Sequence, residues 1–155
     1  MNKYPACWYI ALALCILTIA EGCRSVDEKL PEVVVDRSEC AKCRMLISDA
    51  RFAGLIKTDN YLMFDDIGCM LAYKQKNTSQ TISASWVRDY ASNTWIPIDA
   101  AIFYRMDNIE TPMGYGYIAT SKSNPEPTSL RSASVRIDGE ANLLNDFTKR
   151  LVADR

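Results

Sequence analysis

The stretch Phe64-Asp-Asp-Ile-Gly-Cys-Met-Leu-Ala-Tyr73 decides the fold, because it predicts a junction between a strand and a helix. Tyr61-Leu-Met-Phe64 has the composition of a strand. Asp65 or Asp66 then offers a helix N-cap, where the helix dipole favours a carboxylate. Positions at helical spacing follow: Ile67, Met70, Leu71 and Lys74. We therefore predict that the two aspartates cap a helix rather than form a catalytic carboxylate pair.

The residues around this junction predict a small unit of strand, strand, helix and strand. Residues 51–58 are rich in apolar and β-favouring residues, and Asp59-Asn60 offers a tight turn into the strand at 61–64. Beyond the helix, residues 81–87 alternate in character as a half-buried strand does.

The second half of the chain predicts a similar unit. Three of its segments have the composition of strands: 101–106, 115–120 and 134–137. An amphipathic helix is predicted at 141–152 from the spacing of Leu143, Leu144, Phe147 and Leu151. We expect an α+β fold of two small ββαβ-like units packed together, with sub-units at 37–92 and 93–155.

The N-terminal residues predict an export signal. Lys3 precedes an apolar run over residues 8–20, which is shorter than the ~20 residues of a membrane-spanning helix and suits a secretory signal. Ala20-Glu-Gly-Cys23 is typical of a lipobox, in which the cysteine receives a lipid. An ordinary cleaved signal or an uncleaved anchor is the alternative. We predict a lipoprotein signal peptide at 1–22 and lipid attachment at Cys23.

The segment behind Cys23 predicts an exported protein held at a membrane. Residues 23–36 are largely polar, contain Pro31 and are predicted to form a tether before a folded domain at 37–155. We expect the protein to be anchored by lipid and to face the periplasm or the cell exterior. Because no basic run is interleaved with aromatic residues, no nucleic-acid partner is expected.

The composition argues against ordinary hydrolytic catalysis. The 155-residue chain has no histidine, so the commonest metal ligand and the commonest general base are both missing. Of its six cysteines, Cys7 and Cys15 lie in the predicted signal peptide and Cys23 is the predicted lipid site. The three thiols that remain are an odd number, which argues against a purely structural disulfide framework.

The motif Cys40-Ala-Lys-Cys43-Arg-Met45 brings two thiols and a thioether close together in the chain. Such soft ligands suit Cu(I). Met113 lies in a turn with two glycines that would present its sulfur. The predicted metal ligands are therefore Cys40, Cys43, Met45 and Met113. Cys69, on the predicted helix, is interpreted first as a small buried hydrophobe and only second as a minor ligand candidate.

A C-x-x-C motif also has other uses. A redox dithiol would make the chain a periplasmic thiol–disulfide oxidoreductase that uses Cys40 and Cys43. A structural zinc site needs four ligands, so an Asp or Glu would have to join the three thiolates. A third alternative is a membrane-anchored interaction module in which the motif forms a structural disulfide. The ligand types favour Cu(I) and a protein that is not an enzyme.

The order of these motifs resembles the NosL family of exported, copper-binding accessory lipoproteins of nitrous oxide reductase. The resemblance covers roughly residues 36–120 and is carried by Cys40-x-x-Cys43-x-Met45, Arg51-Phe-Ala53, residues 64–73 and Pro112-Met-Gly114. It implies a protein of two ββαβ-type units that binds Cu(I) outside the cytoplasmic membrane. It also implies delivery of the copper to the reductase or its assembly machinery. Carried over by position, the ligands are again Cys40, Cys43, Met45 and Met113. Family members often have glycine at the position of Arg44.

Overall fold

The fold is described from a computed structural model, which places residues 29–123 and 134–153. The chain divides into two units, Met1–Leu30 and Pro31–Arg155, and the second is described here. The predicted signal peptide at 1–22 and the predicted lipid site at Cys23 lie outside the described residues.

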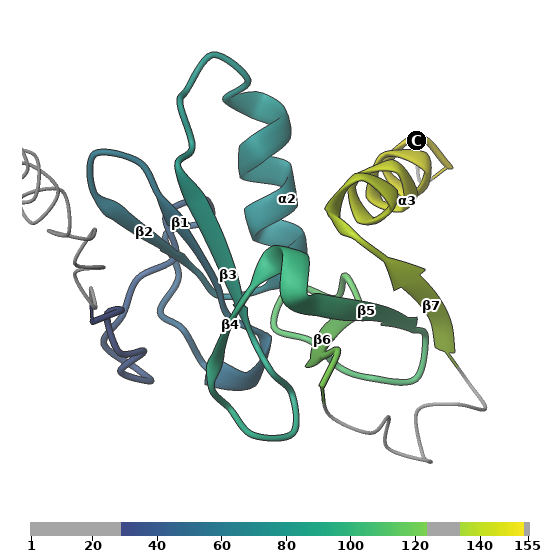
Figure 1. Cartoon of the computed structure of the whole chain (residues 1–155), viewed down its shortest axis with the longest axis horizontal. Coiled ribbons are helices and arrows are strands. Elements are labelled where there is room, and N and C mark those ends of the chain that lie inside the picture. The colour runs from purple at the N-terminus through teal and green to yellow at the C-terminus, as the bar shows by residue number, and fades with distance from the viewer. Residues whose placement is uncertain (1–28, 124–133, 154–155) are drawn as a thin grey trace, which may run out of the picture. The chain divides into compact units, whose positions relative to one another are not determined.

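The first sheet has four antiparallel strands in the order β2-β1-β3-β4 (Figure 1). The strands are β1 (Gly54–Lys57), β2 (Tyr61–Phe64), β3 (Ala84–Arg88) and β4 (Trp95–Pro97). A short 3-10 helix, η2 (Ala50–Phe52), precedes β1, and α2 (Ile67–Lys76) follows β2. The order strand, strand, helix, strand matches the prediction for this part of the chain.

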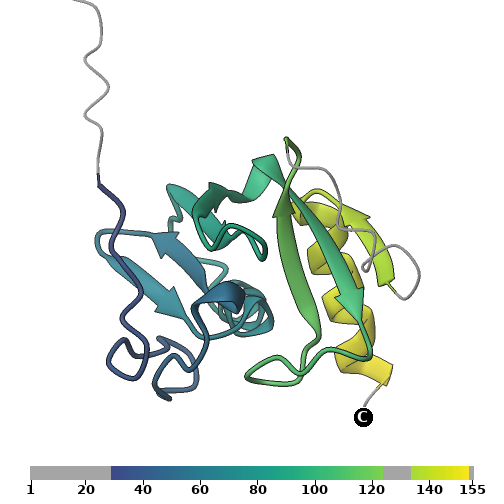
Figure 2. The same ribbon diagram turned by 90° about the horizontal axis from the view of Figure 1, so that it is seen from below.

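The second sheet has three antiparallel strands in the order β6-β5-β7 (Figure 2). The strands are β5 (Ala101–Met106), β6 (Tyr117–Ser121) and β7 (Ser134–Asp138). A 3-10 helix, η3 (Ile98–Ala100), leads into β5, and α3 (Glu140–Ala153) follows β7. Contacts of α3 with both β7 and α2 bring the two halves together, and Figure 1 shows α2 between the first sheet and α3.

The predicted α+β class is confirmed, since two antiparallel sheets and two helices are present in the described residues. Two details differ from the predicted sub-units. First, β4 pairs with β3 and therefore belongs to the first sheet, although its residues fall in the predicted sub-unit 93–155. Second, the other half has the order strand, strand, strand, helix, which is the order of its predicted segments but departs from a ββαβ-like unit.

Trp95 on β4 links Arg88 on β3 with Pro31, the first residue of the described unit. Its ring lies 4.3 Å from the guanidinium of Arg88 on β3, a cation–π contact. Its indole N–H donates to the carbonyl of Pro31 at 2.9 Å. Pro31 and Glu32, which were predicted to lie in the tether, are in contact with the sheet, because Glu32 also forms an ion pair with Arg88 at 3.4 Å.

The end of β3 is also joined to the second sheet. Asp89 is fully buried, and its carboxylate accepts a hydrogen bond from the backbone N–H of Ser121 at 2.7 Å. The next residue, Tyr90, donates its N–H to the carbonyl of Ala119 at 2.8 Å. These bonds fix the first sheet to β6 through backbone groups.

The main apolar core collects side chains from both sheets and both helices. Large buried members include Phe64 at the end of β2, Phe103 on β5 and Phe147 on α3. Cys40 and Cys69 belong to the same core, and both are fully buried. The two thiols therefore lie where apolar packing holds them in place.

Candidate metal centre

The sulfur atoms of Cys40, Cys43 and Cys69 lie within 4.8 Å of one another, and we call these three residues the thiol cluster. All three are free cysteines. Cys40 and Cys69 are fully buried, whereas Cys43 keeps part of its surface exposed. The cluster includes no carboxylate, and the chain has no histidine to add. These three sulfurs could hold a metal ion.

Cys40 and Cys43 lie in a tight loop between two arms of a short hairpin. The arms meet at an antiparallel bridge between Glu39 and Leu46. Inside it, the Cys40 N–H donates to the Met45 carbonyl at 2.8 Å, and the Cys40 carbonyl accepts from the Arg44 N–H at 3.0 Å. Arg44 closes the loop with φ +67°, a left-handed conformation that suits glycine.

The loop is tied to the strand–helix junction that carries Cys69. The Ala41 N–H donates to the carbonyl of Met63 on β2 at 2.8 Å. After the hairpin, the Ser48 N–H donates to the Asp65 carboxylate at 3.1 Å. These two bonds hold the loop beside the end of β2, where α2 begins.

Cys69 lies in the first turn of α2, and the start of this helix is closely fixed. Asp66 is the N-cap, and its carboxylate accepts from the Gly68 N–H at 2.7 Å. The Tyr115 side chain packs on Gly68 so closely that an added Cβ would lie 2.2 Å from the ring. Only glycine fits there, because the ring occupies the space of a side chain. The predicted capping role of Asp66 agrees with this geometry.

Met113 reaches the same helix start through its backbone. The Met113 N–H donates to the second carboxylate oxygen of Asp66 at 3.3 Å, and the Thr111 side chain also bonds to this carboxylate. The Met113 side chain packs against the core that contains Cys40 and Cys69. Met45, by contrast, is 53% exposed. As metal ligands, both methionines stay predictions.

Hydrogen bonds within the thiol cluster favour one thiolate and two thiols. A hydrogen bond from Cys69 lowers the pKa of Cys40 to about 4 despite its burial, and backbone N–H groups of Lys42, Cys43 and Asp65 act in the same direction. The same bond to Cys40, together with burial, raises the pKa of Cys69. Burial raises the pKa of Cys43. Cys40 is thus the thiolate of the cluster near neutral pH.

The two aspartates beside the cluster have structural roles. Burial raises the pKa of both carboxyls, although hydrogen bonds from Ser48 to Asp65 and from Thr111, Gly68 and Met113 to Asp66 oppose the shift. Each carboxylate accepts backbone hydrogen bonds that fix the loop or the helix start. Neither joins the thiol cluster as a ligand.

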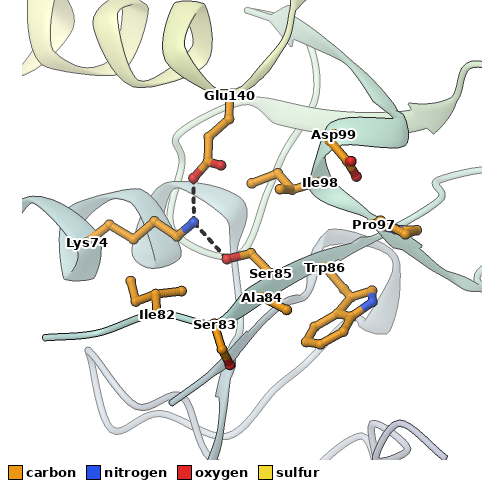
Figure 3. Close-up of a pocket in the computed structure, with 10 residues that line it drawn as sticks. All are labelled: Lys74, Ile82, Ser83, Ala84, Ser85, Trp86, Pro97, Ile98, Asp99 and Glu140. Atoms are coloured by element: carbon orange, nitrogen blue, oxygen red, sulfur yellow. Dashed lines mark hydrogen bonds and ion pairs between the residues drawn. The ribbon is translucent and has the colours of Figure 1, made fainter. Parts of the chain in front are cut away.

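Another part of the described residues contains a groove. It has a volume of about 630 Å³, and its lining includes Trp86, Ile98 and Asp99 but none of the three cysteines (Figure 3). At its floor the Lys74 amine donates to the Ser85 hydroxyl at 2.7 Å and to the Glu140 carboxylate. These bonds join α2, β3 and the start of α3, and we interpret them as structural.

Comparison with models of known protein families and with curated proteins finds no match. Within residues 29–123 and 134–153, no helix has the length and apolar character needed to cross a membrane. The site is therefore interpreted from its own geometry.

The main residue that sequence reasoning undervalued is Cys69. Its position two residues into a helix that follows a strand predicted burial, and burial is what the structure shows. A signal was present, however. Three thiols remain beyond the predicted lipid site, and the chain has no histidine that could complete a metal site at the Cys40–Cys43 motif. Cys69 is the remaining cysteine that could supply a soft ligand there.

Proposed function

We propose that the protein binds Cu(I) at Cys40, Cys43 and Cys69 and delivers it to a copper enzyme outside the cytoplasm. In this proposal it is a metal-delivery protein rather than an enzyme. The observation that carries the proposal is the close approach of three cysteine sulfurs, two of them buried. The motifs shared with the NosL family support nitrous oxide reductase or its assembly machinery as the acceptor.

The ligand set supports Cu(I) over zinc. Thiolates are soft ligands and select Cu(I), which accepts two or three of them. Structural zinc takes four ligands in a closed tetrahedron, and the thiol cluster supplies three. Met45 and Met113 remain proposed as additional thioether ligands on the strength of the family resemblance.

A low coordination number also suits delivery. An ion held by three sulfurs leaves room for a ligand of the acceptor to attack. The export signal and the lipid anchor at Cys23, both proposed from the sequence, would hold the site at a membrane surface. There it would face acceptors outside the cytoplasm.

One observation favours a second candidate, a thiol–disulfide oxidoreductase. The depressed pKa of Cys40 is what a redox-active thiolate needs. The nucleophile must also reach its substrate, and Cys40 is fully buried. The thiol with partial exposure is Cys43, whose pKa is raised. The arrangement of exposure and acidity is therefore opposite to that of an accessible redox dithiol, which makes this candidate the weaker one.

An anaerobic Cu(I) titration tests the proposal. The reference chain has Cys7, Cys15 and Cys23 replaced by serine, so that the thiol cluster alone remains, and it competes with a coloured Cu(I) chelator. We expect one equivalent of copper to move to the protein. A matched variant with Cys40→Ser and Cys43→Ser should lose tight binding while its circular dichroism spectrum is retained. If the reference chain takes no copper from the chelator, the proposal is wrong.

The same reference chain distinguishes the oxidoreductase. Equilibration with glutathione buffers measures whether Cys40 and Cys43 form a disulfide with a defined potential. Catalysis of disulfide exchange in a reduced substrate protein, with no copper binding, would favour the second candidate.

A further inference from the structure

The three thiols are not held equally. The Cys40 backbone is fixed on both sides by hydrogen bonds to Met45 and Arg44. Cys69 lies in the first turn of a capped helix, and its thiol is hydrogen-bonded to the Cys40 sulfur. Cys43 is also hydrogen-bonded to both of these sulfurs, so the three thiols form one cluster, and Cys40 and Cys69 differ from Cys43 in their complete burial.

Exposure separates the third thiol from this pair. Cys40 and Cys69 have no exposed surface, while Cys43 lies between two exposed residues, Lys42 and Arg44. A ligand of another molecule therefore meets the cluster from the side of Cys43. Cys43 lies in the hairpin loop and packs on the outside of the core that encloses the other two thiols, so it can move more easily than they can.

We infer that Cys40 and Cys69 form the retained pair of the metal site and that Cys43 is the ligand that exchanges when copper leaves. This inference rests on the proposed function. The acceptor would present a thiolate or thioether, the soft donors that suit Cu(I). A bond forms between copper and the acceptor sulfur, and the bond between copper and the Cys43 sulfur breaks. The released thiolate takes a proton from water. The metal remains Cu(I), and no electron is transferred.

Comparison of two single variants tests this assignment. Both are made in the full chain with Cys7, Cys15 and Cys23 replaced by serine, and Cu(I) affinity is measured by chelator competition. Loss of an outer-shell partner of a metal ligand typically costs about 10- to 100-fold in metal affinity, and loss of a retained ligand should cost at least as much. We expect Cys43→Ser to lower the affinity by no more than about tenfold and Cys69→Ser by about 100-fold or more.

The outcomes separate this inference from the proposed function. If the reference chain binds copper and Cys43→Ser loses as much affinity as Cys69→Ser, the inference is overturned while copper binding stands. If the reference chain takes no copper, the proposed function fails and the inference fails with it. Unfolding curves of both variants show whether the buried serine at Cys69 disturbs the fold.

A second measurement needs no substitution within the cluster. The copper-loaded reference chain is treated with limiting N-ethylmaleimide and analysed by native mass spectrometry and peptide mapping. We expect the first adduct at Cys43, with copper still bound to the singly modified chain. A first adduct at Cys40 or Cys69, or loss of copper with the first adduct, would overturn the retained pair.

Discussion

The protonation of the thiol cluster predicts how strongly copper affinity depends on pH. Metal ligation requires deprotonated thiols, so binding releases a proton from each thiol that was protonated. The pKa of Cys40 is lowered to about 4, and those of Cys43 and Cys69 are raised above their ordinary value. Between about pH 5.5 and 7.5 the cluster therefore carries one thiolate and two thiols, and under the proposed function copper would displace two protons.

The expected magnitude follows from this proton count. Each displaced proton changes the affinity tenfold per pH unit, or about 1.4 kcal/mol. Two protons give a change of about 100-fold per pH unit, with the affinity falling as the pH falls. Cys43→Ser removes one titrating ligand but keeps the bond between Cys40 and Cys69, so the slope should fall to about tenfold per unit. Met45→Leu is the matched control, because a thioether releases no proton and the slope should not change.

The assay is chelator competition at a series of pH values, corrected for protonation of the chelator. If the affinity of the reference chain changes with pH as expected for three displaced protons, Cys40 is protonated before copper binds. That result would refute the proposed charge state. A slope that Cys43→Ser leaves unchanged would mean that Cys43 does not bind copper as a thiolate.

Three further predictions concern stability, measured by denaturant unfolding. Gly68→Ala should lower the free energy of unfolding by about 1–3 kcal/mol, because its Cβ would lie 2.2 Å from the Tyr115 ring. Gly54→Ala, whose Cβ would lie 2.8 Å from the Met70 sulfur and 3.1 Å from the Met70 Cβ, should lower it less. Arg44→Gly should raise the free energy of unfolding by up to about 1 kcal/mol, because glycine adopts the left-handed conformation of this residue without strain and only an exposed ion pair is lost. A denaturation midpoint no higher than that of Arg44→Ala would contradict this. Asp66→Ala should lower the free energy of unfolding by about 1–2 kcal/mol, and Asp66→Asn should lower it less, because asparagine also caps helices. Equal losses in the two variants would contradict a capping role.

Local patterns predicted the elements near the site well. The strand at 61–64 and the strand at 101–106 have the predicted bounds, and α2 begins directly after its predicted cap, Asp66. These elements have a clear local cause, because composition, spacing and a capping residue all lie within one short stretch of chain.

Boundaries set by special backbone geometry were predicted less well. The strand expected at 51–58 begins only at Gly54, because Asp49 caps a 3-10 turn by accepting from the Arg51 N–H at 2.9 Å. The strand expected at 115–120 begins at Tyr117, after Gly116 with φ +72°. An added Cβ on Gly116 would lie 2.5 Å from the Met106 carbonyl oxygen. Such turns depend on a neighbouring strand that periodicity does not reveal.

The composition of the thiol cluster could not be predicted from spacing. Cys40 and Cys43 share a motif, but Cys69 joins them because the bonds from Ala41 to Met63 and from Ser48 to Asp65 hold the loop beside the helix start. These contacts link residues far apart in sequence. Met45 was predicted as a ligand from its nearness in the chain; its side chain is 53% exposed, and its role stays a prediction.

The packing of Tyr115 on Gly68 has a consequence for how the protein is made. The three thiols are all synthesised by residue 69, yet the ring and the Met113 backbone that support the start of α2 come much later in the chain. A nascent or truncated chain that ends before Thr111 therefore carries all three sulfurs of the thiol cluster without the scaffold that supports the start of α2. Under the proposed function, such a chain would hold copper poorly. Copper occupancy would then indicate that synthesis and folding of both halves are complete.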